Sequence, residues 1–229
     1  MSGMDRPFVS INMAMTADGK ITSAAREEPA FASRYDKKMM DRLRAEADAV
    51  LVGAGTLRAD DPPLHVRDPE MQAHRRSLGK PDGLVNILVT ATASVDPRAR
   101  FFTGHGASER IVATVVDAPA DRLLRLAKVA KVWTVGSGQV DLRELLTRLA
   151  ARGIERLLVE GGGELNWGFV RDDLFDELYV TIAPALLGGR NAPTPCEGEG
   201  LTMAAQRRLR LVSADVKDGE IFCHYAVIR

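Results

Sequence analysis

The sequence predicts an α/β protein built on a mixed, mostly parallel central sheet that is flanked by helices. Short continuous apolar runs, typical of strands covered on both faces, alternate along the chain with segments of helical periodicity. Near the end, Asp218-Gly219 separates two stretches of alternating apolar residues, which indicates an antiparallel hairpin. We therefore expect one domain over residues 1–229, with a C-terminal antiparallel hairpin at an edge of the sheet.

The first elements are a strand, a helix and a second strand. Phe8–Thr16 alternates apolar with smaller or polar residues and then meets a turn, which predicts a strand. Apolar residues at helical spacing follow up to Ala47, with Ser33 as the expected N-cap. Ala49–Gly53 is a continuous apolar run that predicts a buried strand. By composition, the next residues, Gly55–Pro63, are expected to form a loop.

The remainder of the chain repeats this alternation. Arg67–Asp82 is polar, and we expect its basic pair, Arg75-Arg76, to lie exposed on a loop or short helix. Asp141 is the expected N-cap of a helix to Arg152 that Gly153 ends. Further strands are expected at Val85–Thr90, Ile111–Val116, Val132–Val135, Arg156–Val159, Leu178–Ile182, Leu209–Val216 and Ile221–Ile228, and further helices at Asp121–Ala127 and Glu164–Val170.

Composition excludes several classes of function. Lys+Arg and Asp+Glu both number 31, and this balance argues against nucleic acid or an anionic membrane as the main partner. No stretch approaches the ~20 apolar residues of a membrane span. Only two cysteines occur and the N-terminus lacks a secretion signal, so we expect a soluble, cytoplasmic protein. The four histidines show no metal-ligand spacing, and no metal is expected.

The most informative motif is a strand that runs into three glycines. The strand ends at Val159, Glu160 follows, and Gly161-Gly162-Gly163 opens the helix expected from Glu164. Glycines allow close backbone approach to a ligand, and a helix N-terminus presents N–H groups to an anion. This pattern indicates a dinucleotide or phosphate site. The alternative is a tight turn with nothing bound, because the spacing matches neither the Rossmann nor the P-loop motif.

A second glycine-containing loop follows the strand Ala49–Gly53 and ends at Asp60-Asp61-Pro62. Ligands of open α/β sheets bind at the carboxyl ends of strands, so the two loops together favour a shared cleft. Taken alone, this loop favours a solvated turn with Asp60-Asp61-Pro62 over a ligand-binding loop. Neither a nucleophile elbow nor a metal-ligand cluster occurs. The class of reaction that remains is redox or group-transfer chemistry with a bound cofactor.

Several sequence motifs in a fixed order identify a family. They are Arg6–Val9, Met15–Ile21, Leu43–Ala45, Ala47–Leu64, Val159–Gly163, Asp176–Leu178 and Ala183–Gly189. Through them the chain resembles, nearly end to end, the pyrimidine reductases of riboflavin biosynthesis, which share the dihydrofolate reductase fold. Asn12 and Glu164–Gly168 make it more similar to the stand-alone archaeal type than to the bacterial bifunctional type. In Arg26–Ser33, only Ser33 matches a family segment that touches substrate.

The resemblance implies a site and a reaction. NADPH, or alternatively NADH, would deliver hydride to C1′ of a ring-opened ribosylamino group, giving the ribitylamino product. It implies a small-molecule phosphorylated pyrimidine as substrate and a homodimer as the assembly. It implies cofactor contacts at Thr56, Asp60, Val89, Thr90, Ala91, Gly161, Gly162, Gly163, Glu164 and Leu165. It implies substrate contacts at Asn12, Ser33, Arg44, Leu64, Arg67 and Glu160.

Three questions stay open from the sequence. The catalytic proton donor is assigned to Asp60 or Glu160, provided that burial raises its pKa. The substrate is the diaminopyrimidinone or the amino-uracil. Alternatives are a pterin or folate-type reductase on the same fold, which has no use for a phosphate-binding Arg67, and a non-catalytic nucleotide-binding homologue.

Overall fold

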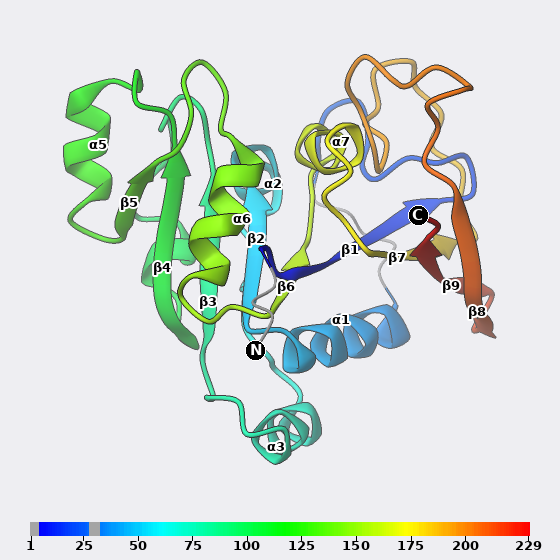
Figure 1. Cartoon of the computed structure of the whole chain (residues 1–229). Coiled ribbons are helices and arrows are strands. Elements are labelled where there is room, and N and C mark those ends of the chain that lie inside the picture. The colour runs from blue at the N-terminus through cyan, green and yellow to red at the C-terminus, as the bar shows by residue number, and fades with distance from the viewer. Residues whose placement is uncertain (1–4, 28–32) are drawn as a thin grey trace. The chain divides into compact units, whose positions relative to one another are not determined.

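The computed structural model describes residues 5–27 and 33–229, and the chain divides into two compact units. Unit 1 comprises Met1–Phe8 and Asp41–Leu158, and unit 2 comprises Val9–Met40 and Val159–Arg229. Figure 1 shows their elements in chain order. The single domain over 1–229 stays a prediction. Residues 28–32 of the segment Arg26–Ser33, and the start of the N-terminus, lie outside the described residues.

Unit 1 is built on parallel strands. Its neighbouring strands follow the order β5-β4-β3-β2, with β6 next to β2, and Figure 1 shows β2 to β5 side by side. All five residues of β2 are buried, which explains its continuous apolar sequence. The bounds are β2 Ala49–Gly53, β3 Leu84–Val89, β4 Ala107–Thr114, β5 Lys131–Thr134 and β6 Arg156–Val159.

Helices connect these strands. In α6, four leucines at helical spacing are buried, and the Asp141 side chain accepts a hydrogen bond from the Glu144 N–H at 3.0 Å, which confirms the expected N-cap. Helix α1, Arg34–Glu46, contributes its second half, from Asp41, to unit 1. The other helices are α2 Ala54–Asp60, α3 Pro69–Ser77, α4 Arg100–Thr103, α5 Ala120–Leu126 and α6 Leu142–Ala150.

Two expectations in unit 1 were wrong. Gly55–Asp60 is helix α2 and not a loop, because burial of Ala54 and Leu57 outweighs the weak helix propensity of the glycine. Arg75 is not exposed: only 1% of its surface is accessible, on the inner face of α3. Its neighbour Arg76 is exposed, as expected.

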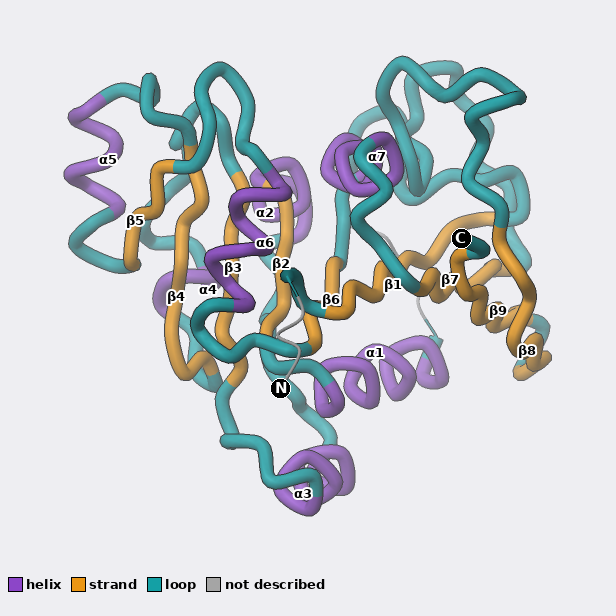
Figure 2. The backbone as a smooth tube through the Cα atoms, viewed as in Figure 1, coloured by secondary structure: helices purple, strands orange, loops and turns teal. Residues whose placement is uncertain are grey.

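Unit 2 holds the rest of the sheet, in the order β1-β7-β9-β8. Strand β1, Phe8–Thr16, is parallel to β7, Glu177–Ala183, whereas β9, Glu220–Val227, is antiparallel to both β7 and β8, Leu209–Lys217. Figure 2 shows the β8–β9 hairpin among the strands drawn in orange. Asp218 and Gly219 have φ of 52° and 85°, so the hairpin turn has the left-handed backbone that Asp-Gly favours.

Across the described residues, nine strands form a mixed, mostly parallel sheet with a C-terminal antiparallel hairpin, which confirms the predicted fold class. Helix α7, Gly163–Arg171, follows β6 in the chain, as the glycine motif predicts. Within the described residues, no helix combines the length and apolar character that crossing a membrane would require.

Candidate functional site

The ends of two adjacent strands in unit 1 bring several of the expected cofactor residues together. Strands β2 and β3 are parallel and in register, with Gly53 paired to Val89. Thr90 continues β3 with its N–H bonded to the Ala113 carbonyl at 3.0 Å, and it is buried, whereas Ala91 is exposed. The β2–α2 junction and the Val89–Ala91 segment therefore emerge at the same edge of the sheet, where α/β proteins bind ligands.

Helix α2 carries Thr56 and Asp60, both partly exposed. A Cβ built on Gly55, in the first turn of α2, would meet no atom within 4 Å, so packing within the chain does not require this glycine. At the other end, the Asp61 carboxylate accepts hydrogen bonds from the Arg100 and Phe101 N–H groups, at 2.7 and 3.3 Å. The end of α2 is thus fixed to the start of α4.

The expected substrate residues of unit 1 lie on α1 and on the segment Asp61–Asp68, called here the phosphate loop after the role expected of Arg67. Leu64 is 4% exposed, so packing alone accounts for it. Arg44 is 1% exposed, and its Nη1 donates to the carbonyls of Pro63 and His65, at 2.8 and 3.0 Å. The Arg67 side chain is 35% exposed. Arg44 therefore holds the loop, while Arg67 reaches the surface from it.

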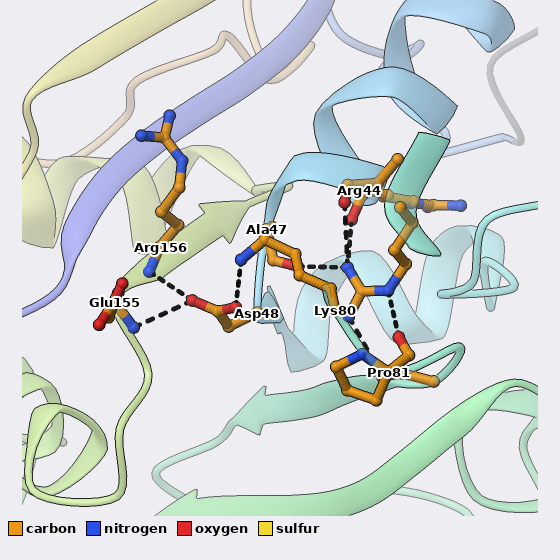
Figure 3. Close-up of polar contacts among 10 residues, drawn as sticks. Arg44, Ala47, Asp48, Lys80, Pro81, Glu155 and Arg156 are labelled. Atoms are coloured by element: carbon orange, nitrogen blue, oxygen red, sulfur yellow. Dashed lines mark hydrogen bonds and ion pairs between the residues drawn. The ribbon is translucent and has the colours of Figure 1, made fainter. Parts of the chain in front are cut away.

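A polar network surrounds Asp48, two residues after the end of α1 (Figure 3). One Asp48 oxygen accepts the N–H groups of Glu155 and Arg156, at 3.0 and 2.9 Å, and the other pairs with Lys80. The buried Arg75 donates to the carbonyls of Arg44, Ala45, Ala47, Pro81 and Gly83. Carbonyls at the end of a helix lack partners within the helix, so Arg75 caps α1.

The glycine motif lies in unit 2, and each of its three glycines has a different structural role. Gly161 has φ of 82°, a left-handed conformation that favours glycine, and it precedes a cis peptide bond to Gly162. Gly162 is the N-cap of α7, so its residue type offers no side chain to cover the first N–H groups. A Cβ on Gly163 would overlap the Glu197 side chain and lie 2.5 Å from the Thr194 carbonyl oxygen. Gly163 is therefore required by contacts within the chain.

Three carboxyl groups of unit 2 interact electrostatically near the expected substrate residue Ser33, and one of the three is the expected substrate residue Glu160. Ser33 caps α1 through the Asp36 N–H, at 3.2 Å, and its hydroxyl donates to Glu220, which is 3% exposed. Burial raises the pKa of Asp36 above its usual value, and the charges of Glu220 and Glu160 raise it further, against a hydrogen bond from Thr181. We call Asp36, Glu160 and Glu220 the carboxyl cluster.

The remaining expected residues are placed individually. Asn12 lies in β1 opposite Tyr179 of β7 and is partly buried. In the first turn of α7, Glu164 is exposed and Leu165 is partly exposed. Sequence reasoning missed Asp36, Glu220 and Asp41. The acidic positions on α1 carry no sequence signal that separates them from a solvated helix face, because their burial depends on β7, β9 and the phosphate loop.

Comparison with known proteins identifies relatives along nearly the whole chain. A family model described as the RibD C-terminal domain matches residues 7–222. Two proteins named 2,5-diamino-6-ribosylamino-4(3H)-pyrimidinone 5′-phosphate reductase are each 37% identical. The one from Methanothermobacter thermautotrophicus aligns over 97% of this chain and 99% of its own length. The one from Archaeoglobus fulgidus aligns over 85% and 88%, respectively.

Solved structures agree in fold. A pyrimidine reductase-like protein from Corynebacterium diphtheriae superposes with a TM-score of 0.84 at 23% identity, covering 97% of this chain and 92% of that one. Dihydrofolate reductase from Enterococcus faecalis, complexed with NADP(H), gives a TM-score of 0.53 at 11% identity and covers 97% of both chains. These likenesses confirm the dihydrofolate-reductase-like fold.

Proposed function

The chain belongs to the RibD C-terminal domain family, and from that membership we propose that it is an NADPH-dependent pyrimidine reductase of riboflavin biosynthesis. The proposed reaction converts the ribosylamino group of a phosphorylated pyrimidine to a ribitylamino group. The observation that carries the proposal is the 37% identity, over almost both full lengths, to a reductase named for the diaminopyrimidinone phosphate. The same name favours that substrate over the amino-uracil. The likeness to dihydrofolate reductase is one of fold alone and does not favour a pterin substrate.

Two features support a dinucleotide cofactor. Gly55 leaves open space at the strand edge that Val89–Ala91 also reaches, and the chain's own packing does not need that space. Independently, α7 begins at a glycine N-cap, which suits a pyrophosphate because the first N–H groups of a helix have no partner within the helix and its dipole favours negative charge. When bound, the reduced nicotinamide would supply hydride. We propose two sets of cofactor contacts, Thr56 and Asp60 in unit 1 and the glycine motif in unit 2.

The chain's own groups must then supply a proton. Opening of the ribose ring forms an imine between C1′ and the amino nitrogen, and reduction adds hydride to C1′ and a proton to nitrogen. We propose that the proton comes from the carboxyl cluster and not from Asp60. The support is that burial and the charges of Glu220 and Glu160 raise the pKa of Asp36, because a carboxyl group with a raised pKa more readily holds a proton that it can donate.

Arg67 is our candidate for the substrate phosphate. A guanidinium suits a phosphate because its planar fork can donate two parallel hydrogen bonds. Within the described residues, neither Nη atom of Arg67 has a hydrogen-bond partner; its one side-chain bond runs from Nε to Asp41 at 3.5 Å. We also propose a homodimer, supported by exposed apolar side chains on the edge strand β8, among them Leu211 and Val216.

The test is NADPH and NADH oxidation measured with the diaminopyrimidinone, the amino-uracil and a dihydropterin side by side. We expect oxidation with the diaminopyrimidinone phosphate and a preference for NADPH. Turnover of the dihydropterin alone would refute the riboflavin assignment, and turnover of none of the three would favour the non-catalytic alternative.

Arg67→Met tests the phosphate contact. Hydrogen bonds to charged groups contribute about 1.5–3 kcal/mol each, so kcat/KM should fall roughly tenfold to more than a hundredfold. The loss should be far smaller for the dephosphorylated substrate. Arg76→Met is the matched control, because Arg76 is exposed and pairs with Asp82 in the same unit.

A further inference from the structure

The phosphate loop is held along its length by two side chains of helix α1. Arg44 binds the carbonyls of Pro63 and His65, and Asp41 binds the last two N–H groups of the loop. Asp41 and Arg44 are three residues apart, so they project from the same face of the helix. Helix α1 thus fixes both the middle and the end of the loop.

Asp41 is a buried carboxylate whose interactions are directed at the loop. It is 5% exposed. Its Oδ1 accepts the Arg67 N–H and its Oδ2 the Asp68 N–H, both at 3.2 Å. A buried charge is costly unless it is paired and hydrogen-bonded, so this carboxylate strongly favours the observed loop conformation.

The same carboxylate also contacts the Arg67 guanidinium. Oδ1 lies 3.5 Å from Nε, so Asp41 holds both the backbone and the head group of one residue. Engaging Nε leaves the end edge of the guanidinium, which carries one hydrogen of each Nη group. Those groups have no partner among the residues that the structure describes, and the side chain is 35% exposed. An arginine held in this way presents a preorganised fork.

The charge around the loop suits an anion. Burial lowers the pKa of His65, and the nearby positive charges of Arg44 and Arg67, followed by His105, lower it further. The charge of Asp41 acts on the pKa of His65 in the opposite direction. The positive charges of Arg44 and Arg67 thus lie close to the loop, and positive charge favours the binding of an anion.

We propose that Asp41 is a positioning residue for the substrate phosphate: it orients Arg67 so that both Nη groups face the phosphate. The proposal rests on the proposed function, in which Arg67 contacts that phosphate. Asp41 itself is not expected to touch a substrate atom. It acts by reducing the number of conformations that Arg67 must give up on binding.

Asp41→Asn tests the proposal, because the amide keeps the shape but has only one acceptor oxygen for the three N–H groups. We expect KM for the phosphorylated substrate to rise about fivefold to thirtyfold, less than in Arg67→Met, with kcat and the NADPH dissociation constant little changed. With the dephosphorylated substrate, kcat/KM should stay at the wild-type value. Asp82→Asn, at an exposed acid of the same unit, is the matched control.

A double mutant separates positioning from a general structural effect. In the Arg67→Met background, Asp41→Asn should not lower kcat/KM for the phosphorylated substrate any further, because the guanidinium that Asp41 orients is absent. Additive losses, or an equal loss on both substrates, would overturn the proposal. If Arg67→Met lowers the preference for phosphate and Asp41→Asn does not, positioning fails while the proposed function stands. If Arg67→Met has no effect, the role of Arg67 and the proposal fail together.

A second variant covers the case in which Asp41→Asn does not fold. Arg67→Lys keeps the charge but has neither Nε nor the fork, so it should lose most of the preference for the phosphorylated substrate. A lysine variant with the wild-type preference would show that orientation through Nε is unnecessary, and would overturn the proposal. The folded state of each variant is checked by its thermal midpoint.

Discussion

Replacement of Arg75 by methionine should strongly destabilise the protein. The residue is 1% exposed, and its guanidinium donates to five backbone carbonyls. The carbonyls of Arg44 and Ala45 belong to the last turn of α1, and that of Ala47 directly follows the helix. The other two, of Pro81 and Gly83, belong to the segment that leads into β3. Methionine fills a similar volume but donates no hydrogen bond, so those carbonyls would be left buried without this partner.

The size of the expected loss in unfolding free energy follows from the N–H donors of the Arg75 guanidinium. Nη1 has two hydrogens for the carbonyls of Arg44, Ala45 and Ala47, so at most two of those bonds reach full strength. Nε and Nη2 supply one bond each, to Pro81 and Gly83. Four bonds to a charged group would sum to more than about 6 kcal/mol, at about 1.5–3 kcal/mol each. Desolvation, which lowers the pKa of Arg75, opposes this, so we expect a net loss of about 3–5 kcal/mol.

Thermal and urea unfolding measure this loss. For a chain of this length, 1 kcal/mol corresponds to about 2–4 °C, so the midpoint should fall by roughly 6–20 °C. Arg76→Met is the control, because an exposed arginine should change stability by no more than about 0.5 kcal/mol. Arg75→Lys should be intermediate, since it keeps the charge with fewer donors. If the unfolding free energy of Arg75→Met lies within about 1 kcal/mol of the control, the carbonyls have other partners and Arg75 is not the cap of α1.

Two further predictions concern unit 2 and the strand edge. Because the folded pKa of Asp36 lies above its ordinary value of 3.8, the native state binds the proton more tightly, and stability is lost as pH rises through the folded value. Asp36→Asn should therefore be more stable than wild type at neutral pH and lose this advantage below about pH 3.8, in unfolding curves at a series of pH values. Gly163→Ala should lower the thermal midpoint by several degrees, because its Cβ would lie 2.5 Å from the Thr194 carbonyl oxygen. Gly55→Ala, in contrast, should fold normally and weaken cofactor binding in a fluorescence titration. Equal midpoints for the two alanine variants would contradict the assignment of the glycines.

Much of the fold could be predicted because its signals are local. The hairpin follows from Asp218-Gly219, whose left-handed backbone is intrinsic to these two residue types. The start of α6 follows from Asp141, since an N-cap satisfies a donor three residues away. The buried strand β2 follows from five consecutive residues without a polar side chain. Each of these requires knowledge of no other part of the chain.

The errors arose where distant segments decide the outcome. Helix α2 forms in a glycine-containing sequence because Ala54 and Leu57 are buried by the rest of unit 1. Arg75 is buried because carbonyls from α1 and from the start of β3 surround its guanidinium. A basic pair in a polar segment is the ordinary pattern of a solvated helix face. Nothing in the local sequence distinguishes Arg75 from Arg76.

The candidate site likewise contains residues that could be predicted from the sequence and residues that could not. The glycine motif was recognised from the strand that runs into it, whereas Thr56 and Glu160 came from the family resemblance, and the roles of all of them stay predictions. The carboxyl cluster was not foreseen, because Asp36 and Glu220 belong to segments at opposite ends of the sequence. Only the fold reveals that Ser33 links them, by capping α1 near Asp36 and donating to Glu220. A raised pKa is a property of that arrangement and not of a motif.

Arginines near the phosphate loop show why residue type alone does not identify a phosphate site. Arg44 and Arg75 are each 1% exposed, and their guanidinium groups bind backbone carbonyls, so they hold the chain in place. A direct contact of Arg44 with substrate stays a prediction, but its Nη1 is already committed to the loop. Arg67 alone among the three combines an exposed side chain with Nη groups that have no partner within the described residues. A phosphate needs hydrogen-bond donors that have no partner within the protein. The side chain that carries those donors must in turn be held in place by residues whose own hydrogen bonds are made within the protein. In the function proposed above, the two buried arginines and Asp41 would provide the rigidity with which one exposed arginine discriminates a phosphorylated substrate.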